Sequence, residues 1–480
     1  MSMASSLLKP LPRAALRMLS AAGCALAFAA ALALPLHGVQ AQQPGGPKTR
    51  LIRDAEIEAL LRDYTRPILK VAGLGQQNVE VVLIADRSYN AFVADGRRIF
   101  VNTGALMDSE TPNQIIGVLA HETGHIAGGH LARMREQIAG LQTMAIVAML
   151  LAGAGVAAGA AAGAGGSSLG GAAAGAMTAP QEMIRRSLLS YQRGEEQAAD
   201  RSAVRYLTET RQSAKGMIET FERFQNEQLF ISQRVDPYLL SHPMAKERIA
   251  ALEQLAKASP YYTTKDSPEL QARHDMMRAK LIGFTERPDV VHRRYPLSDT
   301  SMPALYARAI SAYRFGNVND AIAKIDDLIQ RQPANPYFQE LKGQALLEAG
   351  RAGQAVAPLR KAVAMTNGNP LIRSMLGQAL VQSGNPAFTD EAIRELSFAT
   401  QRDPDSPSAW RSLAMAYGRK GDLANADLAS AQAYMASGEF RTGQELAARA
   451  RQRFAPGTPG WLKSDDILNF KPPKTANAQR

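Results

Sequence analysis

The sequence has 480 residues, of which 46% are hydrophobic and 21% are charged, and its formal net charge is +11. This length is sufficient for two or three domains. The positive charges are not clustered as they are on nucleic-acid-binding surfaces, so the composition argues against a nucleic-acid-binding protein. The moderate basic excess instead favours acidic partners or an anionic membrane surface.

The first 41 residues have the pattern of a signal peptide. Basic residues precede an apolar stretch over 18–36, and the small residues Val39-Gln40-Ala41 follow it as a cleavage site. Cleavage after about Ala41 would remove three positive charges and no negative ones, which lowers the net charge to +8. An uncleaved membrane anchor is the alternative. The single cysteine, Cys24, lies in this segment, so the mature chain would have neither disulfides nor a thiolate ligand or nucleophile.

Residues 42–265 are predicted to form an α+β domain. Its first element is a helix over 54–71, whose apolar residues share one face. Strand patterns follow at 79–84, 90–93 and 98–101, the last two forming a hairpin. A small sheet is therefore expected before the first motif with catalytic potential.

The motif His121-Glu122-Thr123-Gly124-His125 lies in an apolar run that is expected to be helical. Histidines at i and i+4 lie one above the other on a helix, so both imidazoles can reach one metal ion. Glu122 is rotated by about 100° from His121. There it can take a proton from a metal-bound water instead of binding the metal, as in the zinc hydrolases. A helix with two incidental histidines is the alternative. His130 lies about 180° from His121 on an ideal helix and is expected to be a packing or surface histidine.

The segment between Glu136 and Glu182 contains no charged residue, and residues 152–176 are almost all alanine and glycine. It is long enough to span a bilayer, but alanine and glycine drive insertion weakly, and each glycine destabilises a helix by about 1 kcal/mol. We expect residues 143–180 to form a mobile or membrane-touching flap between two active-site helices. A buried, alanine-rich hairpin of the catalytic domain is the alternative.

Catalytic zinc needs three protein ligands and one open position for water. Glu196 is predicted as the third ligand, because it shares the inward face of a helix over 191–208 with Asp200. Asp200 is expected to accept the second ring N–H of a ligating histidine. Glu195 is the competing ligand, although its face carries no acid at the next turn. An acid-rich, solvated helix start that binds no metal is the alternative for both glutamates.

His242 is a further candidate, because Ser241-His242-Pro243 precedes another predicted helix. The proline restricts the backbone, so the imidazole projects at one angle. Two roles remain open for it. It could donate to the oxyanion of the tetrahedral intermediate, or it could occupy the fourth zinc position and keep the enzyme latent. A histidine that merely begins a helix is the third option.

The remainder of the chain is predicted to be a linker and a repeat domain. Residues 266–302 are more polar, contain Pro288 and Pro296, and are expected to form an extended arm. From 303 to 470 the sequence repeats with a period of about 34 residues, with small residues where paired helices must approach closely. This pattern predicts an all-α tetratricopeptide solenoid, a type of array that binds extended polypeptide in a concave groove. Residues 471–480 are expected to be a disordered tail.

Three motifs together resemble the gluzincin family of the HtpX and CAAX-prenyl endopeptidases: His121 to His125, Glu196 to Asp200, and Ser241-His242-Pro243 followed by Arg248-Ile249. The likeness extends over nearly the whole mature chain. The family usually has Glu-x-Glu-Ala-Asp, and Ala198 replaces the second glutamate here. The first glutamate of that motif, which matches Glu196, is the family's metal ligand.

The resemblance implies one Zn²⁺ per chain and Glu122 as the general base. With the signal peptide and the repeats, it points to periplasmic members of the family. These imply unfolded or stalled outer-membrane polypeptides as substrates, and the outer-membrane assembly machinery as a partner of the repeat groove. Substrate is expected to pair with a sheet edge near Asn90 to Ala94. The alternative function is a tetratricopeptide scaffold or chaperone with latent protease activity. Peripheral membrane contact is compatible with the charge-free segment, and nucleic acid is not expected.

Overall fold

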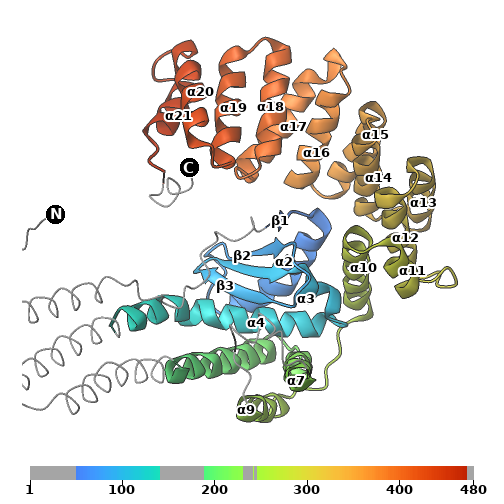
Figure 1. Ribbon diagram of the computed structural model, residues 1–480, viewed down its shortest axis with the longest axis vertical. Helices are drawn as coiled ribbons and strands as arrows, with labels where there is room; N and C mark the ends of the chain where they lie inside the picture. The colour runs from blue at the N-terminus through green and yellow to red at the C-terminus, as the bar shows by residue number, and fades with distance from the viewer. Residues whose placement is uncertain (1–49, 141–188, 231–241, 243–245, 473–480) are drawn as a thin grey trace, which may run out of the picture. The chain divides into compact units, whose positions relative to one another are not determined.

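The computed structural model describes residues 50–140, 189–230, 242 and 246–472. The predicted signal peptide, the predicted flap at 143–180 and most of the predicted tail lie outside the described residues. The described part comprises a small mixed sheet with helices, followed by an array of paired helices (Figure 1). The predicted α+β domain followed by an all-α solenoid is therefore confirmed.

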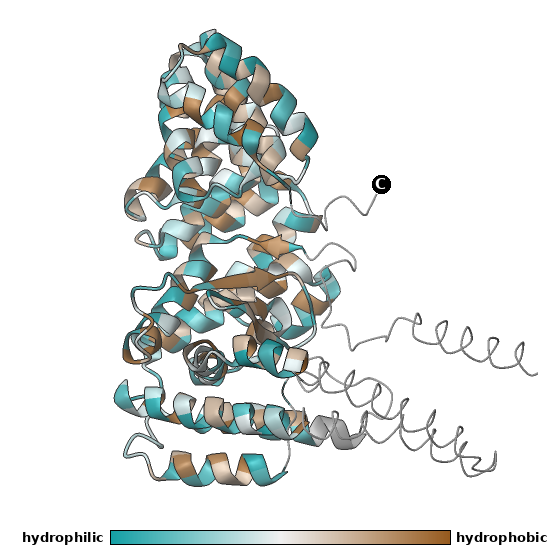
Figure 2. Cartoon of the chain, turned by 90° about the vertical axis from the view of Figure 1, so that its left-hand side faces the viewer, coloured by the Kyte–Doolittle hydropathy of each residue, from teal (hydrophilic) through white to brown (hydrophobic). Residues whose placement is uncertain are grey.

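The sheet has four strands in the order β1-β2-β4-β3. Strands β2 and β4 are parallel, whereas β1 pairs antiparallel with β2 and β3 pairs antiparallel with β4. All the predicted strands are present. The structure also contains the short strand β1, whose two residues are too few to form a recognisable strand pattern in the sequence. Figure 2 shows the strands coloured largely as hydrophobic, because the sheet lies against the core of the domain. The strand bounds are β1 Leu51–Ile52, β2 Glu80–Ile84, β3 Ala91–Asp95 and β4 Arg98–Asn102.

The helices of this domain pack around one core that joins them to the sheet. Asp54 caps the first of them by accepting a hydrogen bond from the Ile57 amide, which satisfies one of the free N–H groups at its start. Figure 1 shows α4 beneath the sheet, with the helix over residues 189–209 running alongside it. The bounds are α2 Ala55–Val71, α3 Thr103–Asp108, α4 Pro112–Gly128, α7 Lys215–Phe230 and α9 Lys246–Lys257.

The segment 266–302, predicted as an extended arm, instead contains the helices α10 (Pro268–Thr285) and α11 (Pro288–Arg294). The prediction failed because α10 has no single apolar face. Its residues Met277 and Leu281 belong to the core of the sheet domain, whereas Met276 belongs to a core that it shares with the first repeat. A helix that contacts two cores is apolar on several sides and lacks the periodicity of a surface helix.

The repeat domain consists of ten helices within the described residues. Gly343 and Gly377 occupy equivalent positions in successive repeats, and a Cβ atom there would overlap Leu359 and Leu396 of the paired helices. This contact explains why small residues recur with the repeat period. The helices are α12 Met302–Phe315, α13 Val318–Arg331, α14 Pro336–Glu348, α15 Ala352–Met365, α16 Pro370–Gln382, α17 Thr389–Arg402, α18 Pro407–Lys420, α19 Leu423–Ala436, α20 Phe440–Arg453 and α21 Pro459–Asn469. A 3₁₀ turn, η1 (Pro386–Phe388), occupies the insertion before α17.

Buried polar contacts join α2, α10 and the first repeat helix. The Lys280 ammonium on α10 lies 2.8 Å from the carboxylate of Asp54 and 3.1 Å from that of Glu56. The Tyr306 hydroxyl on α12 donates to the same Glu56 carboxylate at 2.9 Å. Charges this deeply buried persist only when they are paired, so these contacts fix α10 between its two neighbours. In the described part of the chain, we find no helix with the length and hydropathy needed to cross a membrane.

Candidate metal centre

The structure brings four potential metal ligands together from three segments. His121 and His125 lie on α4, Glu196 lies on the helix over 189–209, and His242 precedes α9. One ligand atom from each of the four lies within 4.8 Å of the others. The histidine pair and the glutamate that the sequence analysis selected therefore converge on one point.

Gly124, between the two histidines, allows the two helices to approach closely. A Cβ atom at this position would lie only 2.9 Å from the carbonyl oxygen of Ala199 and 3.1 Å from its Cα. A larger residue would push the helix over 189–209 away from α4, and Glu196 would move with it. The glycine of the motif is thus a packing requirement of the site.

The distances between the ligand atoms fit a tetrahedral metal ion. The Nε2 atoms of His121 and His125 are 3.0 Å apart, and each lies 3.4 Å from a carboxylate oxygen of Glu196. With bonds of 2.0–2.2 Å, two ligands of tetrahedral zinc lie roughly 3.3 Å apart. Two imidazoles and one carboxylate are also a donor set that catalytic zinc sites use. The residues present therefore fit a zinc ion.

Glu122 is fully buried beside this cluster. Neither of its carboxylate oxygens accepts a hydrogen bond from the described residues, and the Nε2 atom of His242 lies 3.4 Å from one of them. Burial raises the pKa of Glu122 above its usual value. A buried carboxylate without a hydrogen-bond donor is costly for the fold. This position suits a group that receives a proton from a water molecule in the site.

His121 is supported by the residue predicted for this role. Its Nδ1 atom lies 3.0 Å from a carboxylate oxygen of Asp200. Asp200 accepts two hydrogen bonds from the Arg248 guanidinium, from Nε at 2.6 Å and from Nη2 at 2.8 Å. Burial opposes the charge of Asp200, but the contacts with Arg248 keep its pKa below the usual value. Arg248 also lies 2.8 Å from Glu196, so one buried cation holds both carboxylates. Sequence reasoning noted Arg248 in a motif but gave it no role.

His130 supports His125, contrary to the prediction that it is a packing or surface histidine. Its Nδ1 lies 2.9 Å from Nδ1 of His125, and its Nε2 lies 2.9 Å from a carboxylate oxygen of Glu195. On a continuous helix, His130 would lie about 180° from His121. The helix is not continuous there, because Gly129 adopts a left-handed conformation (φ 64°) that ends α4. If His125 binds metal through Nε2, its Nδ1–H donates to His130, and His130 donates in turn to Glu195.

Glu195, the competing ligand, lies outside the four-residue cluster. Besides His130, its carboxylate binds the Arg133 guanidinium at 2.8 Å. Glu195 and Glu196 therefore contact different parts of the site. Glu196 lies beside His121 and His125, whereas Glu195 contacts His130. The geometry favours the prediction of Glu196 as the ligand.

His242 lies where a fourth ligand would be. Its Nδ1 atom is 3.0 Å from a carboxylate oxygen of Glu196 and 3.4 Å from Nε2 of His121. The imidazole is buried, with only 5% of the residue exposed. This arrangement favours a residue that occupies the fourth metal position over one that only begins a helix.

The protonation of the two α4 histidines differs. Burial lowers the pKa of His125 to about 3, so it is neutral at pH 7, as a metal ligand must be. Burial also opposes a charge on His121, but its contacts with Asp200 and Glu196 raise its pKa to about 9. The two carboxylates therefore attract one positive charge to this position, from a proton or from a metal ion.

Comparison with known proteins agrees with this geometry. Residues 52–256 match peptidase family M48, and residues 306–370 and 346–416 match tetratricopeptide repeat families. The chain contains a family M48 peptidase domain. This match confirms the resemblance inferred from the three motifs. Family M48 is a metallopeptidase family. The histidine and glutamate cluster of this chain could hold the metal ion.

Several curated proteins are similar to this chain at modest identity. The chain is 24% identical to the beta-barrel assembly-enhancing protease of Yersinia pestis, over 78% of this chain and 75% of that protein. It is 23% identical to the protein of that name from Escherichia coli K12, over 57% of this chain and 54% of that protein. The chain thus spans about half the length of several curated relatives that it matches. Among solved structures, MamA MSR-1 C2 is 20% identical with a TM-score of 0.30, covering 36% of this chain and 99% of that chain.

Proposed function

We propose that this protein is a periplasmic zinc-dependent endopeptidase that cleaves unfolded or stalled polypeptides in outer-membrane protein assembly and quality control. The observation that carries the proposal is the convergence of His121, His125 and Glu196 beside the buried carboxylate of Glu122. The names of the relatives support the assembly role, since they are called beta-barrel assembly-enhancing proteases.

The three proposed ligands would hold zinc, and Glu122 would move the protons of the reaction. Zinc, when bound, supplies a Lewis acid that polarises the scissile carbonyl and lowers the pKa of a water molecule. Glu122 takes the proton of the attacking water and passes it to the leaving amine. Its burial suits both steps, because a raised pKa brings the carboxyl group closer to the pH at which it must accept and release a proton.

The supporting residues keep the ligands in position and in the correct protonation state. Asp200 orients His121 and is itself held by Arg248, whereas His130 orients His125 and is held by Glu195. Each of the two histidines therefore has a polar side chain within 3.0 Å of its other ring nitrogen. Such partners fix the tautomer and the orientation of the ring.

The substrate would lie along the free edge of β3. In the described sheet β3 pairs only with β4, so its other edge can accept a peptide strand. Pairing through the backbone would hold an extended polypeptide without reading its sequence. This mode suits unfolded substrates of varied sequence.

His242 would keep the enzyme latent by occupying the fourth metal position. The support is the position of its Nδ1 atom, 3.0 Å from Glu196 and 3.4 Å from His121. Displacement of this imidazole would open the position for water and substrate. A latent form would protect other periplasmic proteins from indiscriminate cleavage.

The repeat array would select substrates and partners. Tetratricopeptide arrays bind extended polypeptide, and we propose the outer-membrane assembly machinery as the partner, with peripheral contact to the membrane. The rival function is a scaffold or chaperone whose repeats act while proteolysis stays latent. The same cluster of potential ligands favours the peptidase, since a scaffold does not require it.

The test compares casein hydrolysis by the wild type and by Glu122→Gln. The substitution removes the base and leaves the three proposed ligands in place, so the variant should retain zinc and its fold. Hydrolysis should fall by about two to four orders of magnitude. Hydrolysis by the variant within a few-fold of the wild type would refute the proposed mechanism.

A further inference from the structure

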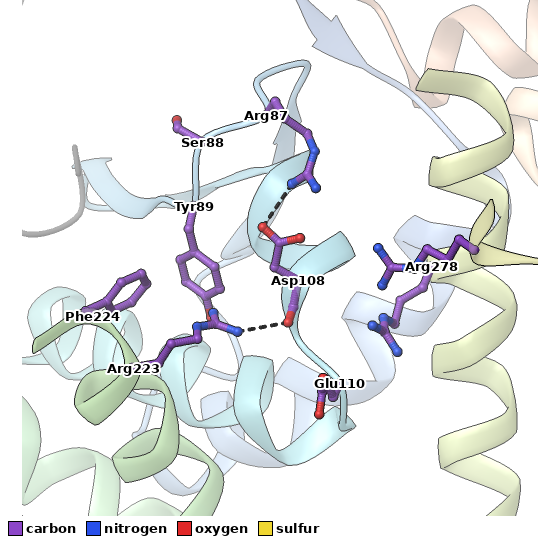
Figure 3. A pocket seen from close by; sticks show the side chains of 9 residues that line it. Arg87, Ser88, Tyr89, Asp108, Glu110, Arg223, Phe224 and Arg278 are labelled. Atoms are coloured by element: carbon purple, nitrogen blue, oxygen red, sulfur yellow. Dashed lines mark hydrogen bonds and ion pairs between the residues drawn. The ribbon is translucent and has the colours of Figure 1, made fainter. Parts of the chain in front are cut away.

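Four arginines line a pocket of about 420 Å³ that lies apart from the metal centre. They come from four separate elements: Arg87 precedes β3, Arg223 lies on α7, Arg278 lies on α10 and Arg294 ends α11. Figure 3 shows Arg87 and Arg223 reaching Asp108 from two sides, with Arg278 across the pocket. The other lining residues are Ser88, Tyr89, Asp108, Glu110 and Phe224.

Three of the guanidinium groups converge on the end of α3. Arg278 and Arg294 both donate to the carbonyl oxygen of Met107, at 3.2 Å and 3.4 Å. Arg223 donates to the carbonyl oxygen of Asp108 at 3.0 Å. The free carbonyl groups at the end of a helix attract cations. Two guanidinium groups on one carbonyl, however, bring like charges together, and the pKa of Arg278 is lowered by its burial and by Arg294.

Carboxylates balance only part of this charge. Arg87 is paired with Asp108 at 2.9 Å and with Glu286 at 3.1 Å. Among the described residues, Arg223 and Arg294 form no ion pair with a carboxylate. The carboxylate closest to Arg278 is that of Asp275, at 3.8 Å. The lining itself holds four arginines and only two carboxylates, those of Asp108 and Glu110, so it has spare guanidinium N–H groups and an excess of positive charge. Guanidinium groups bind carboxylates and phosphates strongly through paired hydrogen bonds.

The position of the pocket indicates which oxyanion it binds. Arg87, Ser88 and Tyr89 line it and lead directly into β3, which begins at Ala91. A peptide that pairs antiparallel with the free edge of β3 runs in the opposite direction, so its carboxyl end reaches the start of the strand. That is the side on which the pocket lies.

We propose that the arginine pocket binds the α-carboxylate of a polypeptide whose final residues lie antiparallel along β3. The proposal rests on the function proposed above, and it adds a feature of the substrate, a free carboxyl terminus. The chemistry of the pocket would also accept inorganic phosphate, so the test must separate the two ligands.

The test measures binding in the Glu122→Gln background, in which peptide is not consumed. The probe is a short fluorescein-labelled peptide of alternating valine and threonine, prepared with a free carboxyl terminus and as the C-terminal amide, and affinity is measured by fluorescence anisotropy. We expect amidation to weaken binding by about tenfold, because a charge-assisted contact is lost. Arg294→Gln should reduce this difference to less than about twofold.

Arg293→Gln is the matched control. Arg293 is the neighbouring residue on α11, is exposed and pairs with Asp289, so the variant has the same net charge as Arg294→Gln but an intact pocket. It should keep the effect of amidation. Arg294→Lys retains the positive charge at this exposed position and should restore part of the difference in affinity between the acid and the amide. Such a partial recovery would show that Arg294 acts in binding and that the loss in Arg294→Gln is not caused by misfolding.

Two results would overturn the proposal. One is equal affinity of the protein for the acid and the amide forms of the peptide. This result would overturn the proposal even if inorganic phosphate bound to the wild type and not to Arg294→Gln, because the pocket would then be a phosphate site. The other is an amidation effect that persists unchanged in Arg294→Gln. Because binding is measured without hydrolysis, failure of the peptidase function would show separately, as absence of casein cleavage by the wild type.

Discussion

His274 should make the protein sensitive to acid. This histidine on α10 is fully buried, and its Nε2 lies 2.8 Å from the carbonyl oxygen of Ser109. Since a carbonyl can only accept, Nε2 carries the hydrogen, and Nδ1 accepts from the Tyr64 hydroxyl at 3.0 Å. The neutral ring is thus satisfied on both sides. Protonation would place a second N–H against the Tyr64 hydroxyl and a charge in the core.

Burial lowers the pKa of His274 to about 4, and Arg278 acts in the same direction. The unfolded chain, with an ordinary pKa of 6.5, therefore binds the proton more readily than the folded protein. The stability that depends on neutral His274 is fully present above pH 6.5 and is lost progressively as the pH falls from 6.5 to about 4. At pH 4 the loss amounts to about 3 kcal/mol, since one unit of pKa difference corresponds to about 1.4 kcal/mol.

The assay is urea unfolding of the wild type and of His274→Gln at pH 7 and at pH 4, both after removal of metal. The other acid-sensitive groups are common to the two proteins, so their contributions cancel in the comparison. The variant should be less stable than the wild type at pH 7, because the buried hydrogen bonds are disturbed. Its further loss of stability at pH 4 should be smaller by about 3 kcal/mol. An equal loss in both proteins would refute the reasoning about His274.

Three further predictions concern the metal centre. Glu196→Gln should abolish stoichiometric zinc binding whereas Glu195→Gln should retain it, and equal zinc contents by metal analysis would exclude Glu196 as the distinguishing ligand. His130→Phe should weaken zinc affinity by about 10- to 100-fold, because His125 loses the partner of its second ring nitrogen; unchanged affinity in a chelator competition would restore a purely packing role. His242→Ala should raise basal casein hydrolysis if the imidazole occupies the fourth position, whereas a fall of about a hundredfold would assign it to the oxyanion.

Local spacing made the central part of the site predictable. The i, i+4 pair on α4 depends only on helix geometry, and the shared face of Glu196 and Asp200 depends on the same periodicity. The structure brings His121, His125 and Glu196 together and places Asp200 3.0 Å from His121, whereas their roles stay predictions. The repeat array was predictable for a similar reason, since the small residues at close helix contacts recur at a fixed period.

The remaining features arise from tertiary contacts or from a single backbone angle. The left-handed turn at Gly129 brings His130 to His125. An ideal-helix projection cannot predict this position, because the helix ends at that turn. Arg248 reaches Asp200 from 48 positions further along the chain. Helix α10 was missed because adjacent parts of its surface belong to different cores, so it has no single apolar face. The arginines of the pocket come from four separate segments of the chain, so no local sequence pattern marks the pocket.

One zinc ion in this cluster is expected to drive peptide hydrolysis. The most direct measurement is a zinc titration of the chelator-treated protein, with zinc content and casein hydrolysis followed together. We expect hydrolysis to be absent without metal and to reach its maximum at one zinc ion per chain, while Glu122→Gln binds the same amount of zinc and stays inactive. Hydrolysis by the metal-free protein, or a protein that binds no zinc, would contradict this expectation.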